Sequence, residues 1–198
     1  MQELNNSVFL LLNASSSPDA TAVLIAKFFA VYAIWLVPVT LVAGWLRGDA
    51  HLRKSMLVAA ASGLAGLLFA QIIGLVWHHP RPFMVGLGQT LIPHAADSSF
   101  PSDHLTLLWA VAFSFLIHKK SRVAGIALGV LGIPMAWARI YLGVHFPLDM
   151  LGAAMVAGFS AWLCFRGTGF LTGPPFIYAD AIYRRLFAPL IRRGWVRE

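Results

Sequence analysis

Three clusters of polar residues interrupt a chain that is otherwise apolar, and their side chains share one kind of chemistry. The first cluster is Arg81-Pro82, the second is Pro101-Ser102-Asp103-His104, and the third has the pattern Arg-x5-His-x3-Asp, formed by Arg139, His145 and Asp149. An arginine presents a planar fork that fits two oxygens of a phosphate group. A histidine beside a carboxylate is held in one orientation and can act as a nucleophile or a base. The clusters therefore indicate catalysis on a phosphate group.

The residue types also predict a division of roles. Asp149 would accept a hydrogen bond from one ring nitrogen of His145, which leaves the other nitrogen free to attack phosphorus. His104 is the candidate general acid that protonates the leaving group. Arg81 and Arg139 would bind the anion and balance the charge that develops during transfer. Because these two arginines can supply positive charge, we expect neither a metal ion nor another cofactor.

The second cluster predicts an anion site at the start of a helix. Pro101 suits the first turn of a helix, where its missing N–H group is not needed. The backbone N–H groups of Ser102, Asp103 and His104 would then be free to bind an anion, with help from the helix dipole. The Ser102 hydroxyl adds another donor. Ser102 and Asp103 therefore join the predicted phosphate-binding residues.

The composition requires a membrane. Apolar residues make up 59% of the 198 residues and charged residues only 12%, about half of the charged fraction of a soluble domain. A surface of this kind must be covered by lipid. We predict an all-α bundle of five membrane-spanning helices over residues 20–46, 56–77, 102–118, 123–142 and 147–165. The third is short for a span and needs to be shielded by its neighbours.

The distribution of basic residues predicts the orientation of the bundle. Segments 47–55, 118–122 and 166–198 lie on one side of a five-span bundle and contain 12 of the 15 lysines and arginines. Cytoplasmic loops of membrane proteins are rich in these residues, so the N-terminus and the three clusters are expected outside and the C-terminus in the cytoplasm. Because the basic residues are split among segments and form no continuous face, we expect no binding to nucleic acid.

Both ends of the chain are predicted to lie on membrane surfaces. Residues 1–19 lack the basic start of a cleavable signal peptide, and their apolar stretch 8–12 would lie on the outer surface. Residues 166–198 mix aromatic and aliphatic side chains with paired arginines, which is typical of an amphipathic helix on the cytoplasmic surface. A sixth span in this tail is the alternative, although it would place Arg184 and Arg185 in lipid.

The joint pattern of the three clusters resembles that of the type 2 phosphatidic acid phosphatase superfamily. That pattern reads Lys-x6-Arg-Pro, then Pro-Ser-Gly-His, then Ser-Arg-x5-His-x3-Asp, and the order and spacing agree over residues 20–165. The resemblance implies His145 as the nucleophile, His104 as the acid and the two arginines as phosphate ligands. It also implies a single membrane phosphatase domain over residues 1–198.

Three positions depart from this pattern, and the flanking residues narrow the resemblance. Gly74 stands at the place of the lysine, Asp103 at that of the glycine, and Ala138 at that of the serine in the third motif. The Pro-Ser-Asp-His variant and segments 94–100 and 141–145 resemble bacterial undecaprenyl-diphosphate phosphatases linked to bacitracin resistance. This resemblance implies a polyprenyl diphosphate substrate, the lipid carrier of cell-wall synthesis, hydrolysed on the outer side of the bacterial inner membrane.

Lys27 is a further candidate phosphate ligand, because it lies within the first predicted span near its outer end. A lysine in lipid is costly unless something offsets the cost. Its side chain either extends to the outer headgroups or replaces the motif lysine that is missing at Gly74.

Other functions stay open at this point. The same chemistry would serve phosphatidate or phosphatidylglycerol phosphate. A transporter or channel would place its charges at mid-membrane, whereas these residues fall at the ends of spans. Vanadium-dependent haloperoxidases share the site pattern but resemble soluble proteins. The loop histidines have two alternative interpretations, metal binding and loop polarity; they are His78, His79 and His94. Asp97 and Asp103 could tune His104 or pair with an arginine.

Overall fold

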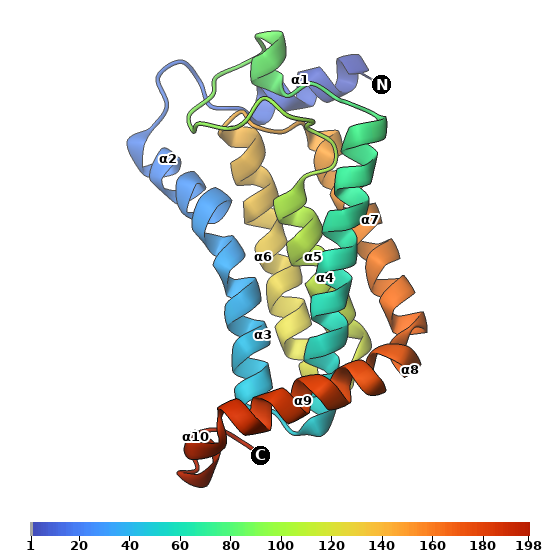
Figure 1. The fold of residues 1–198 in the computed structure, drawn as a ribbon. Coiled ribbons are helices and arrows are strands. Elements are labelled where there is room, and N and C mark those ends of the chain that lie inside the picture. The colour runs from blue at the N-terminus through green and yellow to red at the C-terminus, as the bar shows by residue number, and fades with distance from the viewer. Residues whose placement is uncertain (1) are drawn as a thin grey trace.

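The chain forms five long helical segments that run between the two ends of the molecule (Figure 1). The computed structural model describes residues 2–198, and within that range it contains helices and no strand. The segments are α2 (Ala20–Lys27) continued through η1 (Phe28–Tyr32) and η2 (Ala33–Trp35) into α3 (Leu36–Arg47), then α4 (Ala50–Val76), α5 (Asp103–Ile117), α6 (Arg122–Tyr141) and α7 (Pro147–Arg166). The prediction of an all-α bundle is confirmed.

Four of the five segments are long and apolar enough to cross a membrane. The fifth is α5, an apolar helix of only 15 residues. The helix ends agree with the predicted spans except at α4, which begins at Ala50 and not at residue 56. The reason is a cap, because the Asp49 side chain accepts a hydrogen bond from the Leu52 N–H at 2.9 Å. Arg53 and Lys54 therefore lie within a helix and not in a linker.

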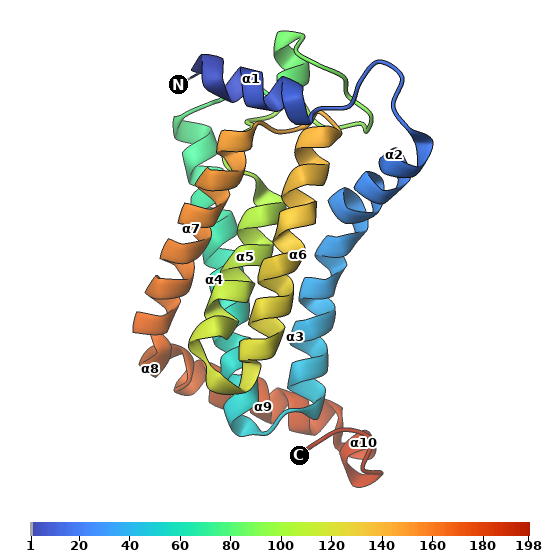
Figure 2. The same cartoon turned by 180° about the vertical axis from the view of Figure 1, so that it is seen from behind.

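The two ends of the chain cover opposite ends of the bundle. The N-terminal helix α1 (Gln2–Leu12) crosses the end that carries the long loops, as Figures 1 and 2 show. At the other end lie α8 (Thr168–Leu171), α9 (Pro174–Leu186) and α10 (Ala188–Arg192), with α9 running across the bundle (Figure 1). The tail is helical, as predicted. No helix in the described part of the tail meets the length and hydropathy of a sixth span.

A buried arginine fastens this tail to the bundle. Arg53 is fully buried, and its guanidinium donates to Asp180 on α9 at 2.8 Å and to the carbonyl of Arg197 at 2.6 Å. Its Nε donates to the Trp45 carbonyl at 3.1 Å, and the guanidinium carbon lies 4.4 Å from the centre of the Tyr183 ring. A buried arginine is tolerated when its charge and its donors are matched in this way. The contacts join α3, α4 and α9.

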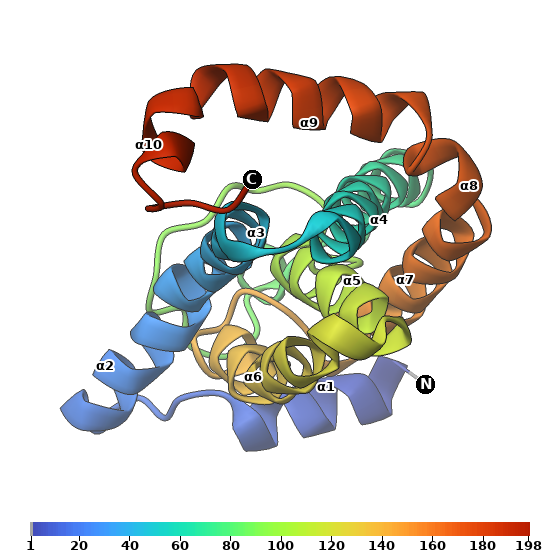
Figure 3. The same ribbon diagram turned by 90° about the horizontal axis from the view of Figure 1, so that it is seen from below.

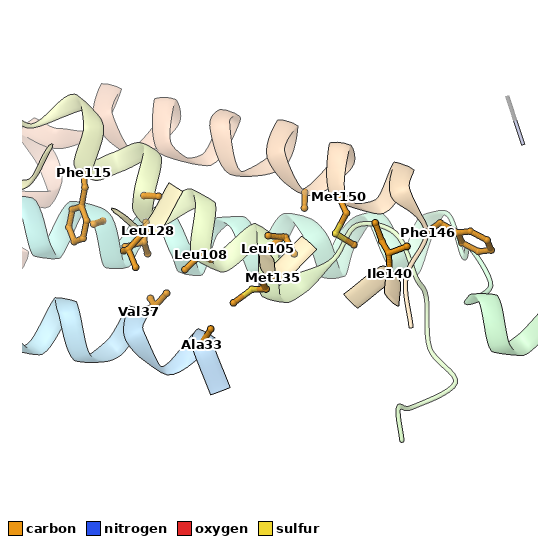
Figure 4. Packing of buried hydrophobic residues seen from close by; sticks show 14 of the residues in the cluster. Ala33, Val37, Leu105, Leu108, Phe115, Leu128, Met135, Ile140, Phe146 and Met150 are labelled. Atoms are coloured by element: carbon orange, nitrogen blue, oxygen red, sulfur yellow. The ribbon is translucent and has the colours of Figure 1, made fainter. Parts of the chain in front are cut away.

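The core of the bundle is built around α5, which packs against α4, α6 and α7. Figure 3 shows α5 between these helices when the molecule is viewed along the bundle. Figure 4 shows buried side chains from four of the segments meeting in one cluster, among them Ala33, Val37, Leu105, Leu108, Phe115, Leu128, Met135 and Met150. Its neighbours therefore shield α5, which accounts for a helix too short to face lipid on its own.

Close packing between α7 and the long loop predicts that Gly152 cannot be enlarged. A β-carbon at Gly152 would overlap the Phe100 ring, whereas one at Gly158 on the same helix would lie 4.0 Å from the nearest atom of Phe113. We expect Gly152→Ala to destabilise the protein by about 1–3 kcal/mol, because the ring must move within a packed site. Thermal unfolding in detergent measures this, with Gly158→Ala as the matched control. Equal melting temperatures for the two variants would contradict the packing argument.

Candidate active site

The three polar clusters meet at the end of the bundle that α1 covers. The loop from Trp77 to Ser102 joins α4 to α5 at this end and contains the short helix η3 (Pro82–Val85), and residues 142–146 join α6 to α7 there (Figure 2). Of the predicted residues, the structure brings Arg81, Arg139, His145 and Asp149 into direct contact, and none of the four is more than 4% exposed.

Asp149 holds the ring of His145 in one orientation. Its Oδ2 accepts from the Phe146 N–H at 2.7 Å and lies 3.2 Å from Nδ1 of His145. The hydroxyl of Ser99 donates to the same oxygen. An ionised carboxylate can only accept, so the favoured tautomer has its proton on Nδ1 and a lone pair on Nε2. The predicted pairing of His145 with Asp149 is present in the structure.

Two guanidinium groups converge on the other ring nitrogen. Nη1 of Arg81 lies 3.1 Å from Nε2 of His145, and Nη2 of Arg139 lies 3.2 Å from the same atom. Arginine has donors and no acceptor, so these contacts require the lone pair of Nε2 to point at the two cations. A phosphoryl group at Nε2 would have its oxygens within reach of both forks. The geometry therefore suits attack by Nε2 on a bound phosphate.

The long loop fixes Arg81. Its Nε donates to Asp97 at 2.8 Å, and its two terminal nitrogens donate to the carbonyls of Val144 at 2.8 Å and Ser98 at 3.1 Å. Burial alone would raise the pKa of Asp97, but the hydrogen bond and the charge of Arg81 outweigh it, so the pKa lies below its ordinary value. Asp97 is therefore ionised near neutral pH. Of the alternatives left open for Asp97, the structure contains the ion pair with an arginine.

Arg139 is held by a different kind of partner. Its Nη1 donates to the carbonyl of Ala30 at 3.3 Å, and its Nη2 lies 3.0 Å from Nε2 of His94. Ala30 belongs to η1, a π-helical turn inside the first long segment. Turns of this type are rare and frequently lie at functional sites. Nothing in the residues of this turn indicated such a role, because the contact is made by the backbone.

His94 was missed as a site residue, since as a loop histidine it has no informative spacing to other ligands. Its ring centre lies 6.1 Å from that of His145, and it is only partly exposed. Burial and the charge of Arg81 lower its pKa, so it is neutral near pH 7 and Nε2 can accept from Arg139.

Among residues 2–198, no group of three His, Cys, Asp or Glu side chains is placed to hold a metal ion.

The start of α5 differs in detail from the prediction. Asp103 is the first helical residue and Ser102 is its N-cap, so Pro101 precedes the helix instead of opening it. The Ser102 N–H donates to the Asp149 carbonyl at 3.4 Å and is not free for an anion. The N–H groups of Asp103 and His104 belong to the first turn, which leaves them without partners inside the helix.

Three buried polar atoms of the predicted site residues have no hydrogen-bond partner within residues 2–198. They are Oγ of Ser102, Nε of Arg139 and Oδ1 of Asp149. Buried polar atoms without partners are rare in folded proteins, and when several gather at one place they indicate a ligand or solvent that completes them. Two of the three can donate to an anion.

The side chain of Asp103 points toward α4. Its Oδ2 accepts from the amide of Gln71 at 3.0 Å. Asp103 lines a cavity of about 210 Å³ together with Gly74, Asp97 and Ser98. Two of the three departures from the superfamily pattern, at positions 74 and 103, thus lie in the same cavity. His104, one residue further, is partly buried, and no hydrogen bond to its ring occurs among the described residues.

The N-terminal helix α1 and the segment after it fix the loop that carries His145. The Asn5 side chain accepts from the Leu148 N–H at 3.0 Å, and the Asn13 amide donates to the Tyr141 carbonyl at 3.0 Å. Gly143 has φ of +80°, a conformation that few other residues adopt. These contacts close the end of the bundle over the site.

Lys27 is the one candidate that the structure does not bring to this cluster. It lies in the last turn of α2 with an exposed side chain. Its neighbours are apolar, and they include Leu24 and Phe28 in a shallow hollow. Seven of the eight predicted residues thus lie in the loops and helix ends at this end of the bundle, and Lys27 lies on the outside of the bundle.

An apolar helical bundle with a buried histidine between two arginines at one end is the arrangement expected of a membrane phosphatase. Residues 54–172 match the model of the PAP2 superfamily, and the chain belongs to this superfamily. The resemblance inferred from the three clusters is confirmed.

Two relatives align with most or all of the chain. The chain is 36% identical over 201 residues to YbjG of Escherichia coli strain K12, with 100% of each chain covered; the name of YbjG assigns it provisionally to the undecaprenyl-diphosphatases. It is 37% identical over 174 residues to the undecaprenyl-diphosphatase BcrC of Bacillus subtilis strain 168, with 88% of each chain covered.

Solved structures share the fold. LpxE of Aquifex aeolicus superposes with a TM-score of 0.64 at 20% identity, over 82% of this chain and 95% of that one. A PAP2 type phosphatidylglycerolphosphate phosphatase of Bacillus subtilis superposes with a TM-score of 0.55 at 20% identity, over 82% of this chain and 83% of that one. At this identity the likeness concerns the bundle alone.

The environment of His145 predicts how activity depends on pH. Burial, followed by the charges of Arg139 and Arg81, lowers the pKa of His145 well below its usual 6.5. The neutral ring is the nucleophilic form, so activity should persist as pH falls through 6.5 and disappear only in more acidic solution. The measurement is kcat/KM against pH, which reports the free enzyme. Arg139→Gln removes one charge and should raise the pH at which its residual activity is lost. A parent acid limb at or above 6.5 would contradict this account.

Proposed function

We propose that the chain is an undecaprenyl-diphosphatase, which hydrolyses the diphosphate of the polyprenyl lipid carrier to the monophosphate and inorganic phosphate. The observation that carries this proposal is the position of Nε2 of His145, which is flanked by the guanidinium groups of Arg81 and Arg139 at 3.1 and 3.2 Å. The relatives that are 36% and 37% identical over most of their length supply the substrate class.

The reaction would proceed in two displacements at the terminal phosphorus. Nε2 of His145 forms a bond to phosphorus, the anhydride P–O bond breaks, and the lipid monophosphate leaves with a proton from His104. Water then attacks the phosphohistidine after His104 takes its proton, and inorganic phosphate leaves. His104 regains its protonated form in this step, so the enzyme returns to its starting state.

The remaining site residues would stabilise the charge of the transferring group. Arg81 and Arg139 bind its equatorial oxygens, and Ser102 donates its unpaired hydroxyl. The first turn of α5 adds N–H groups and the positive end of the helix dipole. Asp103 contributes through this backbone position. Asp149 keeps His145 in the tautomer that attacks.

We propose that this end of the bundle faces the periplasm of the bacterial inner membrane. The support is the charge distribution, because 12 of the 15 lysines and arginines lie in the end turns of the spans or in the segments beyond them at the opposite end. The N-terminus would then be outside and the C-terminus in the cytoplasm. A polyprenyl diphosphate in the outer leaflet would present its headgroup at the depth of the site.

The role of Lys27 stays a proposal. It lies in the hollow on α2, one turn before Ala30, whose carbonyl binds Arg139. In this proposal, Lys27 replaces the motif lysine that is missing at Gly74 and contacts the distal or bridging phosphate of the substrate. Extension of the lysine to the outer headgroups is the alternative.

A comparison of substrates tests the function. We expect the purified protein to release phosphate from undecaprenyl diphosphate with a kcat/KM at least about 10-fold above that for phosphatidate or phosphatidylglycerol phosphate, a difference of about 1.4 kcal/mol in transition-state binding.

His145→Ala should abolish turnover, since no covalent intermediate can form. Acid-quenched parent enzyme should carry phosphate on His145, and His78→Ala, which changes an exposed histidine of the long loop, should keep activity. Preference for phosphatidate, or turnover by His145→Ala, would overturn the assignment.

Removal of the acid should matter most for poor leaving groups. We expect His104→Gln to reduce hydrolysis of phosphatidate, which expels an alkoxide, by about 100- to 10,000-fold. Hydrolysis of p-nitrophenyl phosphate should fall much less, because the nitrophenolate needs little protonation. Steady-state kinetics on both substrates measure the difference. Equal losses would remove His104 from the role of acid and leave it as a structural residue.

A further inference from the structure

A second basic site lies at the end of the bundle opposite His145. It is a cavity of about 660 Å³ between the first turns of α4, the turn that joins α5 to α6, and α8. Figure 3 views the molecule from this end and shows α4 and α8 beside the end of α5. The reaction proposed above uses none of these residues. The cavity is therefore available for a ligand of its own.

We call this cavity the basic cavity, because its lining contains basic side chains and no acidic ones. Three lysines, Lys54, Lys119 and Lys120, come from two different elements, and the histidines His51 and His118 lie with them. None of the lining residues is acidic. Hydroxyl groups and apolar side chains complete the surface, among them Ser55, Thr168, Val58 and Ile117. This combination of cations with apolar surface suits the headgroup end of an anionic amphiphile.

Contacts outside the cavity hold two of its three lysines in place. The Lys54 ammonium lies 5.2 Å from the centre of the Phe176 ring on α9, and Lys120 forms an ion pair with Asp49. Lys119 has no ion-pair partner among residues 2–198. The Arg53 anchor holds α9 in place beside Lys54. Since the surroundings are already ordered, a ligand would lose little free energy to rearrangement.

The ion pairs of the tail and of the cavity can be compared residue by residue. Arg184 is paired with Asp180 at 2.7 Å and with Glu198 at 2.8 Å, so its charge is matched within the chain. In the basic cavity, one of three lysines is matched by a carboxylate. Arg192 and Arg193 in the tail also have no ion-pair partner among residues 2–198, so the cavity differs from the tail in that two unpaired lysines line one concave site.

We propose that the basic cavity binds the phosphate headgroup of an anionic phospholipid from the leaflet at this end of the bundle. Lys54 and Lys119 would contact the phosphate, and the acyl chains would follow the apolar surface that begins at Val58 and Ile117. The apolar part of the lining favours a lipid over free phosphate, since an inorganic ion would gain nothing from it. Each lysine near an anionic headgroup contributes about 1 kcal/mol.

Lipid retention in native mass spectrometry tests this inference. The full-length protein, purified in detergent, is equilibrated with equal amounts of phosphatidylglycerol and phosphatidylcholine. We expect retention of one phosphatidylglycerol, and Lys54→Gln/Lys119→Gln should reduce this retention about 10- to 30-fold, the loss of two headgroup contacts. The matched control is Arg192→Gln/Arg193→Gln, which removes the same charge from the tail, outside the cavity, and should retain the lipid. Unfolding temperatures without added lipid verify that both variants fold, and Lys119→Gln alone replaces the double variant if that one unfolds.

Three outcomes would overturn the inference. Equal losses in the cavity variant and the tail control would mean that diffuse charge attracts the lipid. Equal retention of phosphatidylcholine would mean that the cations do not select it. Inorganic phosphate that raises the unfolding temperature as much as phosphatidylglycerol would assign the cavity to a free anion. Hydrolysis by the parent enzyme is a separate measurement, so failure here leaves the proposed reaction untouched.

Discussion

Two cations directed at one imidazole nitrogen impose most of the constraints on this structure. The guanidinium groups of Arg81 and Arg139 both lie close to Nε2 of His145 in a site from which solvent is nearly excluded. They repel each other, and burial makes the repulsion stronger. The arrangement persists because each guanidinium group also donates hydrogen bonds to other acceptors. Arg81 donates to Asp97 and to backbone carbonyls, and Arg139 donates to the Ala30 carbonyl. A site ordered in this way stabilises developing negative charge without reorganising.

Several carbonyl groups that accept hydrogen bonds from the two arginines belong to irregular backbone, and the bundle accommodates this backbone. In a membrane protein such backbone is tolerated only where its polar groups find partners inside the protein. The π-helical turn η1 directs a carbonyl at Arg139, and the short loop after Gly143 directs that of Val144 at Arg81. Helix α5 has 15 residues, or about 22 Å, against a hydrocarbon core of about 30 Å. Its first turn therefore begins inside the bundle (Figure 1), which leaves room for the loops above it.

The sequence was informative where side-chain type and spacing carry the chemistry. Arg139, His145 and Asp149 follow one another at spacings that place them at the turn between two spans, and the structure joins them as predicted. The sequence was silent on Ala30, because a backbone carbonyl leaves no trace in residue type. For Lys27, the sequence predicted its depth in the first span but not the direction in which its side chain points. A π-helical turn adds a residue to the helical repeat just after this lysine, so the face it occupies does not follow from regular periodicity.

The departures from the superfamily pattern acquire a meaning only in three dimensions. A lysine at position 74 and a glycine at position 103 would add one positive charge beside Asp97, whereas Gly74 and Asp103 add a carboxylate to the same cavity. The formal charge of this side of the site is thus lower by two than the pattern provides. Arg81 and Arg139 must then carry the positive charge without a lysine beside them. Asp103 accepts a hydrogen bond from the Gln71 amide, which directs its carboxylate to α4 and thus to the cavity that Gly74 lines.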